Sequence, residues 1–107
     1  MVFTAHVHNY QRFSRKIKNR KVPFIVAGAG GYWHLHNMPK DNGQPLVAPH
    51  HLPDAGVTLE NYNADRHGYM LLEVTRTFIK GEYFTVPRPH ESWSAPSQRI
   101  DSFTIQL

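Results

Sequence analysis

The sequence contains no cysteine among its 107 residues. Disulfide bonds and thiolate metal sites are therefore excluded, and any metal ion must be held by nitrogen and oxygen ligands. The sequence also lacks a run of the roughly 20 apolar residues that a membrane-spanning helix needs, and no signal peptide precedes the first predicted strand. We expect no membrane partner for this chain.

The composition is that of a folded protein, with 40% hydrophobic and 19% charged residues. A chain of this length forms at most one domain, and it is too short to be a whole large enzyme. We therefore treat residues 1–107 as a single unit.

Much of the formal charge of +4 comes from residues 12–21, RFSRKIKNRK. Such a run is typical of a solvated surface. The more specific alternative is a basic patch that binds phosphate-bearing partners. Aromatic residues do not alternate with its cations, as they do in proteins that bind single-stranded nucleic acid. We expect no nucleic-acid partner.

Five runs of the sequence have the β-branched, aromatic or alternating pattern of strands. One of them, Val22–Ala27, is apolar throughout, as in a strand that is buried on both faces. Residues 75–77 separate two of the runs by a length typical of a hairpin, and Phe103, Ile105 and Leu107 alternate with polar residues. The runs are Met1–Val7, Val22–Ala27, His67–Val74, Phe78–Val86 and Ile100–Leu107.

Residues from Tyr32 to Asp65 show no sustained period and are rich in Pro, Gly, Asn, Asp and His. They predict a long loop over about residues 32–66, with one helical turn near Thr58–Tyr62. Loops of this length are usually functional or mobile. The predicted fold class is mainly β, a mostly antiparallel sheet of about five strands with a long loop insertion.

Two histidines stand two positions apart near the start of the chain, in the run TAHVHNYQRF. On a regular strand, His6 and His8 would face the same side, about 7 Å apart. Neutral imidazole binds zinc, iron and manganese, and two metal ions about 3.5–4 Å apart suit one imidazole on each ion. Two surface or hydrogen-bonded histidines are the alternative interpretation.

The wider stretch FTAHVHNYQRF, followed by VPFIVAGAGG, resembles the last metal-binding motif of the calcineurin-like metallophosphoesterases, in particular the purple acid phosphatases. Their pattern is Gly-His-x-His with an aromatic and a basic residue soon after. The later stretches RHGYMLLEV and DSFTIQL are similar to the closing strands of that family's catalytic domain. The resemblance implies that the chain is the C-terminal part of an α/β four-layer β-sandwich metallophosphoesterase domain.

By this resemblance His6 binds one metal ion of a dinuclear centre and His8 binds the other. The ions are Fe, Mn or Zn, two per complete site. The family uses them to activate a water or hydroxide and to clamp the phosphate, so the implied function is metal-dependent hydrolysis of phosphate esters. No catalytic side chain is assigned within this chain. Asn9, Tyr10 and Arg12 follow the ligands directly and would shape the edge of the site.

Two departures from the family pattern limit what the chain can do alone. Ala5 stands where the family has glycine, a residue that tolerates a positive φ. The family's other ligand motifs, which carry aspartates, an asparagine and further histidines, are absent. We therefore expect this chain alone to complete no dinuclear site and to be inactive.

The predicted loop holds further candidates for contact with a phosphate ester. His34 and His36 form a second His-x-His pair, in GGYWHLH, and Tyr32 and Trp33 beside them are candidates for lining a substrate pocket. Solvated loop histidines are the alternative for this pair. The glycines of residues 28–31, GAGG, could present amides to a phosphate, although a strand-end turn is favoured. The candidate substrate-binding residues are thus Asn9, Arg12, Tyr32, Trp33, His34 and His36.

A second hypothesis comes from a different class of protein. A non-catalytic β module that has lost its metal centre would keep the same strands and act as an interaction or structural piece. Its exposed sheet face would then bind a partner or a second copy of the chain, which gives a homo-oligomer.

Overall fold

Two main β-sheets and a small hairpin make up the fold, and a computed structural model describes all residues from 1 to 107. The chain contains no α-helix, so the prediction of a mainly β fold is confirmed. A single 3₁₀ turn covers Pro53–Ala55. The strands are β1 (Val2–Thr4), β2 (Tyr10–Ile17), β3 (Arg20–Ala27), β4 (Lys40–Asp41), β5 (Gln44–Pro45), β6 (His50–Leu52), β7 (Val57–Asn63), β8 (Gly68–Val74), β9 (Phe78–Thr85) and β10 (Gln98–Gln106).

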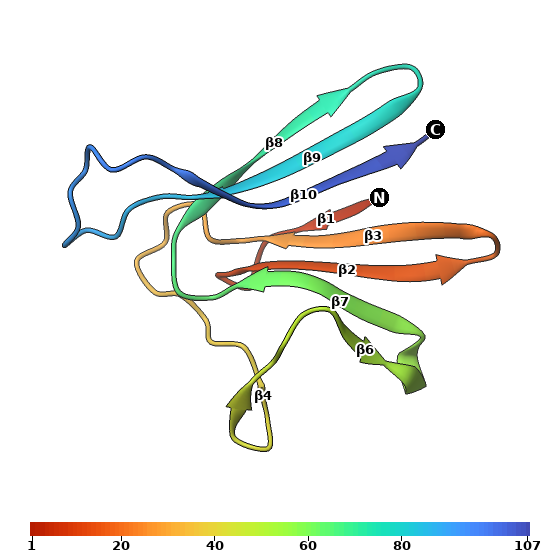
Figure 1. The fold of residues 1–107 in the computed structure, drawn as a ribbon, viewed down its shortest axis with the longest axis horizontal. Helices are drawn as coiled ribbons and strands as arrows, with labels where there is room; N and C mark the ends of the chain where they lie inside the picture. The colour runs from red at the N-terminus through yellow and green to blue at the C-terminus, as the bar shows by residue number, and fades with distance from the viewer.

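The larger sheet has the strand order β1-β3-β2-β7-β6, and only the β1–β3 pair in it is parallel. A second, antiparallel sheet has the order β10-β9-β8, and β4 pairs with β5 in a separate hairpin. The expectation of one sheet of about five strands is therefore wrong. Figure 1 shows the second sheet diverging from the first toward the turn that joins β2 and β3.

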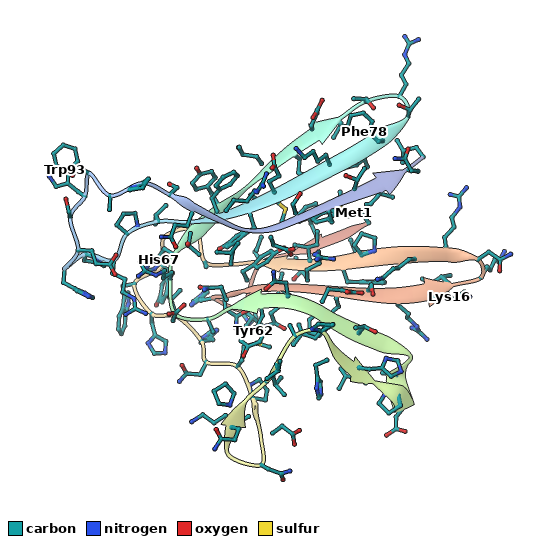
Figure 2. All side chains as sticks on the ribbon, in the orientation of Figure 1. Met1, Lys16, Tyr62, His67, Phe78 and Trp93 are labelled. Atoms are coloured by element: carbon teal, nitrogen blue, oxygen red, sulfur yellow. The ribbon has the colours of Figure 1, made fainter.

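The two sheets pack around a small, mainly aromatic core, and Figure 2 shows the side chains of both sheets on the ribbon. Tyr10 on β2, Ile25 on β3 and Tyr83 on β9 are fully buried at its centre. The rings of Tyr10 and Tyr83 come from different sheets and stack with their centroids 3.8 Å apart. Further partly buried residues pack against this core, namely Ala27, Met70, Ile100 and Phe103.

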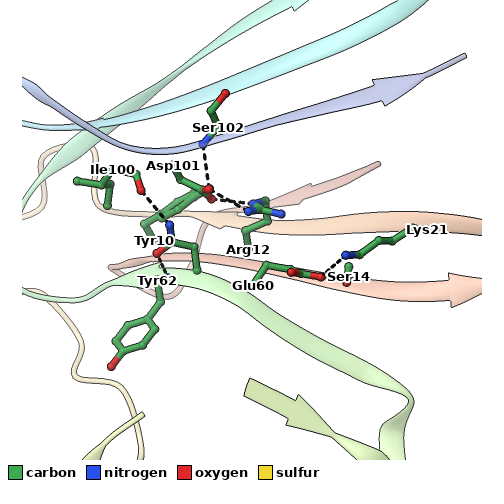
Figure 3. A network of polar contacts seen from close by, with 10 residues as sticks. Tyr10, Arg12, Ser14, Lys21, Glu60, Tyr62, Ile100, Asp101 and Ser102 are labelled. Carbon is green, nitrogen blue, oxygen red and sulfur yellow. Dashed lines mark hydrogen bonds and ion pairs between the residues drawn. The ribbon is translucent and has the colours of Figure 1, made fainter. Parts of the chain in front are cut away.

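A buried ion pair joins the sheets beside this core (Figure 3). Asp101 on β10 accepts hydrogen bonds from Nε and Nη2 of Arg12 on β2, at 2.7 and 2.9 Å, and from the hydroxyl of Tyr10 at 2.6 Å. Asn61 on β7 donates to the carbonyl of Ile100 at 2.9 Å. Burial alone would raise the pKa of Asp101, but the hydrogen bonds from Arg12 and Tyr10 outweigh it and hold that pKa below its usual value.

Four of the five predicted strand runs are confirmed, in β3, β8, β9 and β10. The alternation predicted for the last run is present from Ser102 to Ile105, because Phe103 and Ile105 are partly covered while Ser102 and Thr104 are exposed. It fails at Leu107, which is 63% exposed. The predicted hairpin at residues 75–77 joins β8 to β9. Apolar patterning therefore identifies all three strands of the second sheet and one strand, β3, of the larger sheet.

The sequence pattern missed β2, which lies in the basic run. Its eight residues pair with β3 from Tyr10, opposite Ala27, to Ile17, opposite Arg20. Residues 15–21 at the end of this hairpin are exposed. Solvent therefore surrounds the cations there, and only the half of β2 nearer Tyr10 enters the core.

The predicted loop over residues 32–66 is only partly a loop, and the helical turn near Thr58–Tyr62 is wrong. Those residues lie in β7, which pairs with β2 on one side and β6 on the other. Leu59 is 1% exposed, so packing in the sheet overrides any local helical preference. The helical turn falls instead at Pro53–Ala55, where proline fixes φ and Gly56 ends the turn with a φ of 59°.

The first strand is shorter than expected, because β1 ends at Thr4. The chain then bends through residues 5–9, since it must cross to β2, which is separated from β1 by β3. Ala5 does not have a positive φ, so an alanine at this position causes no backbone strain. His6 and His8 do not lie on a regular strand, and the same-face spacing expected for them is wrong.

We predict that Asp101→Asn lowers the free energy of unfolding at pH 7 by about 3–5 kcal/mol, because it leaves the buried Arg12 without a charged partner. Urea denaturation measures this loss. The pKa of Asp101 is lower in the folded chain, so its stabilising effect is present above the unfolded pKa of about 3.9 and disappears as the pH falls through the folded pKa. The difference between variant and parent should therefore shrink below pH 4.

Glu82→Gln is the matched control, because it makes the same change in a carboxylate of the second sheet. Glu82 pairs with Arg99 and Lys80 at the surface, and we expect a loss below about 1 kcal/mol. Equal losses for the two variants would contradict a special role for Asp101.

Candidate metal centre

The segments that follow the two parallel strands, β1 and β3, meet at one end of the larger sheet. Because these strands run in the same direction, their C-terminal ends lie side by side, and the chain leaves both at that end. Residues 5–9 follow β1, and residues 28–38, which we call the histidine loop, follow β3. This topology makes the first His-x-His pair a neighbour of the second.

Gly28 allows the two segments to approach closely. A Cβ atom at this position would lie 2.0 Å from the carbonyl oxygen of Val7 and 3.0 Å from that of Ala5. The amide of Gly28 donates to the carbonyl of Asn9 at 3.1 Å. The start of the GAGG stretch therefore holds the backbone of residues 5–9, as expected of a strand-end turn.

Hydrogen bonds between His8, Asn9 and His36 fix the histidine loop. The amide of His36 donates to the carbonyl of His8 at 3.0 Å, and the amide of His8 donates to Nδ1 of His36 at 3.0 Å. The Asn9 side chain, which is 1% exposed, donates to the carbonyl of His36 at 3.1 Å and contacts Sδ of Met38 at 3.6 Å. Asn9 is thus a positioning residue for the loop.

The ring of His8 is fixed in one tautomer when it is neutral. Its Nδ1 lies 3.0 Å from the carbonyl oxygen of His34. A carbonyl can only accept, so Nδ1 of His8 carries the hydrogen and Nε2 keeps its lone pair. His36 has the opposite tautomer, because its Nδ1 accepts from the backbone of His8. Of these two rings, only His8 presents a bare Nε2.

Aromatic rings surround His8. Its centroid lies 4.4 Å from that of Tyr32 and 4.5 Å from that of His36, and the two imidazoles are nearly parallel. The pKa of His36 is lowered, first by loss of hydration and then by the neighbouring rings of His8, His34 and His6. The ring of His36 therefore resists protonation, which would break its bond from the His8 amide.

The remaining candidates of the histidine loop face solvent. Trp33 is 79% and Tyr32 56% exposed, and His34 and His6 are exposed as well. The carbonyl of Tyr32 accepts a hydrogen bond from Nε2 of His67 at 2.7 Å. Two clefts of about 610 and 370 Å³ lie elsewhere, and none of these side chains lines them. A substrate pocket at Tyr32 and Trp33 stays a prediction.

Arg12 and Tyr10, expected at the edge of the site, lie between the sheets instead. Both are bound to Asp101, and the ring of Tyr10 is in the core. Sequence reasoning missed Asp101, because no local pattern marks a partner that lies 89 positions from Arg12. Gly28 could have been identified, since it directly follows an apolar strand.

The chain supplies an incomplete donor set for a dinuclear centre. No group of three or more His, Asp or Glu side chains is arranged to hold a metal ion. His6 and His8 offer two imidazoles, and His8 is held in a tautomer that suits ligation. Five of the eight carboxylates are engaged in ion pairs, namely Glu60, Asp65, Glu82, Glu91 and Asp101. The residues present therefore offer two imidazoles and no complete set of metal ligands.

Comparisons with known proteins give no relative for this chain. No protein-family model, curated protein or solved structure matches it. None of its helical segments has the length and apolar character needed to cross a bilayer. The functional argument therefore rests on the residues and their geometry.

We predict that Gly28→Ala displaces residues 5–9, because the new Cβ would clash with the carbonyl of Val7. Overpacking of this kind costs about 1–3 kcal/mol, measurable by urea denaturation. The amide resonances of His8 and Asn9 should shift in the ¹H–¹⁵N spectrum.

Gly30→Ala is the control, since a Cβ at position 30 has no atom within 4 Å. It should change neither the stability nor the His8 resonance. If the two alanine variants behave alike, the close approach at Gly28 does not position the histidines.

Proposed function

We propose that this chain supplies the His-x-His half of a dinuclear metal centre, and that the complete domain hydrolyses phosphate esters as a metallophosphoesterase similar to purple acid phosphatases. One observation carries the proposal: the carbonyl of His34 holds the ring of His8 at 3.0 Å, which leaves Nε2 free. Metal-binding histidines are commonly oriented by such a bond from the other ring nitrogen. His6, exposed two residues earlier, offers the second imidazole.

The two histidines would bind one ion each, Fe, Mn or Zn, through neutral imidazole nitrogens. The bound ions would supply an activated water and neutralise the phosphate oxygens. Protons compete with metal ions for the same nitrogens, so binding should release protons and weaken in acid. The other ligands, oxygen donors among them, must come from outside this set of residues, because no carboxylate of the chain joins the two histidines.

The remaining candidates divide into two roles in this proposal. His34, Tyr32 and Trp33 are exposed beside His8 and would contact the phosphate ester. His36 and Asn9 position the histidine loop through their hydrogen bonds with residues 8 and 38. Arg12 joins the sheets through Asp101, and its guanidinium is occupied there.

In the protein that carries the complete domain, we predict that His6→Ala and His8→Ala each lower kcat/KM for p-nitrophenyl phosphate or its diester by at least about 100-fold. Far-UV circular dichroism should be unchanged, because both side chains lie outside the core. His51→Ala on β6 is the control and should keep full activity. Activity retained in both His6 and His8 variants would overturn the proposal.

For the chain alone, we predict fewer than one tightly held metal ion after loading with zinc or manganese and dialysis, measured by elemental analysis. Two imidazoles without carboxylates do not complete either ion's coordination. Excess zinc should shift the resonances of His6 and His8 before those of His50 and His51. Two tight ions per chain would show that other side chains complete the site.

The second candidate function is a non-catalytic β interaction module. It is favoured by the exposed apolar residues of β1 and β8, such as Phe3 and Leu71, which are 42% and 53% exposed. Under this alternative, replacing His6 or His8 in the complete protein would leave partner binding intact and remove no hydrolysis. The activity assay on those variants therefore separates the two candidates.

A further inference from the structure

Strand β8 forms an open edge of the second sheet. It pairs with β9 along all seven residues and has no neighbour on its other side. Proteins usually protect such an edge with a short strand, a bulge, a lysine or a proline. The sequence of β8, GYMLLEV, has no lysine or proline and only one charged residue, Glu73, and its register with β9 is unbroken. The other sheet ends in strands of only three residues, β1 and β6.

Exposed apolar side chains gather on β8. Tyr69, Leu71, Leu72 and Val74 are 42%, 53%, 44% and 66% exposed. Tyr69 and Leu71 point to one face of the sheet, while Leu72 and Val74 point to the other, because side chains alternate along a strand. A strand that is apolar on both faces is typical of the interior of a sheet.

The chain also exposes more surface than a compact protein of its size. Its accessible area is 7449 Å², whereas a folded monomer of 12.4 kDa exposes about 6,100 Å². Its radius of gyration is 14.6 Å, against about 13 Å for a compact chain of this length. The excess of about 1,300 Å² exceeds the roughly 800 Å² that each partner buries in a standard interface.

We propose that a second copy of this chain covers β8, by antiparallel pairing of the two β8 strands about a two-fold axis. The two three-stranded sheets would then form one six-stranded sheet. A two-fold axis centred on Leu71 places Leu71 opposite itself, Met70 opposite Leu72, and Tyr69 opposite Glu73 of the second copy. Every pair then includes an apolar or aromatic side chain, and no like charges face each other.

The charge distribution permits this approach of two basic chains. Residues 1–40 contain seven Lys and Arg and no Asp or Glu, whereas residues 41–107 contain the other five of the 12 cations and all eight acids. The cations therefore concentrate on the larger sheet, and β8 carries a single charge, Glu73. The pairing is independent of the proposed function, because neither His6 nor His8 takes part in it.

Sedimentation equilibrium of the chain at tens of micromolar should give twice its mass of 12.4 kDa. Leu71→Lys should give the monomer mass with an unchanged far-UV spectrum, since Leu71 is exposed in the single chain. Val47→Lys is the matched control, because Val47 is 80% exposed outside β8, and it should remain a dimer. A monomeric parent, or a dimer that survives Leu71→Lys, overturns the proposal.

Cross-linking tests the register directly. The sequence has no cysteine, so Leu71→Cys introduces the only thiol. Opposed residues in antiparallel strands have Cα atoms about 4.5–5.5 Å apart, within the range of a disulfide. Mild oxidation should convert most of this variant to a covalent dimer, while Val47→Cys should cross-link slowly. Equal cross-linking of the two variants contradicts pairing through β8.

Discussion

The carboxylate of Asp101 is the contact on which the arrangement of the two sheets depends. It accepts two hydrogen bonds from Arg12 and one from Tyr10, and all three residues lie at the junction of β2 and β10. Tyr10 and Arg12, which follow the His-x-His pair in the sequence, therefore join the two sheets through Asp101. Because Tyr10 begins β2 directly after residues 5–9, the same contact also fixes the end of the segment that carries His6 and His8.

The parallel pairing of β1 with β3 determines where the two His-x-His pairs lie. It brings residues 5–9 and the histidine loop to one end of the sheet, where Gly28 lets their backbones approach closely. The bonds that follow are reciprocal, since His8 and His36 each donate a backbone amide to the other residue. The result is a hydrogen-bonded support for one imidazole, that of His8, whereas the imidazole of His6 is exposed to solvent.

Parts of this architecture were predictable from the sequence and parts were not. The apolar and alternating runs predicted β3, β8, β9 and β10, because these strands carry the β-branched, aromatic and aliphatic side chains typical of a sheet, although most of those on β8 are exposed. The basic strand β2 and the polar strand β7 have no such pattern and form because each pairs with neighbours on both sides. The His-x-His pair was visible as a motif, but its bend was not, and the bond from His8 to His34 spans 26 residues. Interactions at that separation depend on the topology of the sheet, which the sequence did not reveal.

The most direct test of the account is the tautomeric state of His8, read from a long-range ¹H–¹⁵N spectrum of the imidazole rings at a pH above 7. The account predicts hydrogen on Nδ1 and a bare Nε2 for His8, with the opposite tautomer for His36. A His8 ring that carries its hydrogen on Nε2 would contradict the account, because the carbonyl of His34 would then not orient it for metal binding.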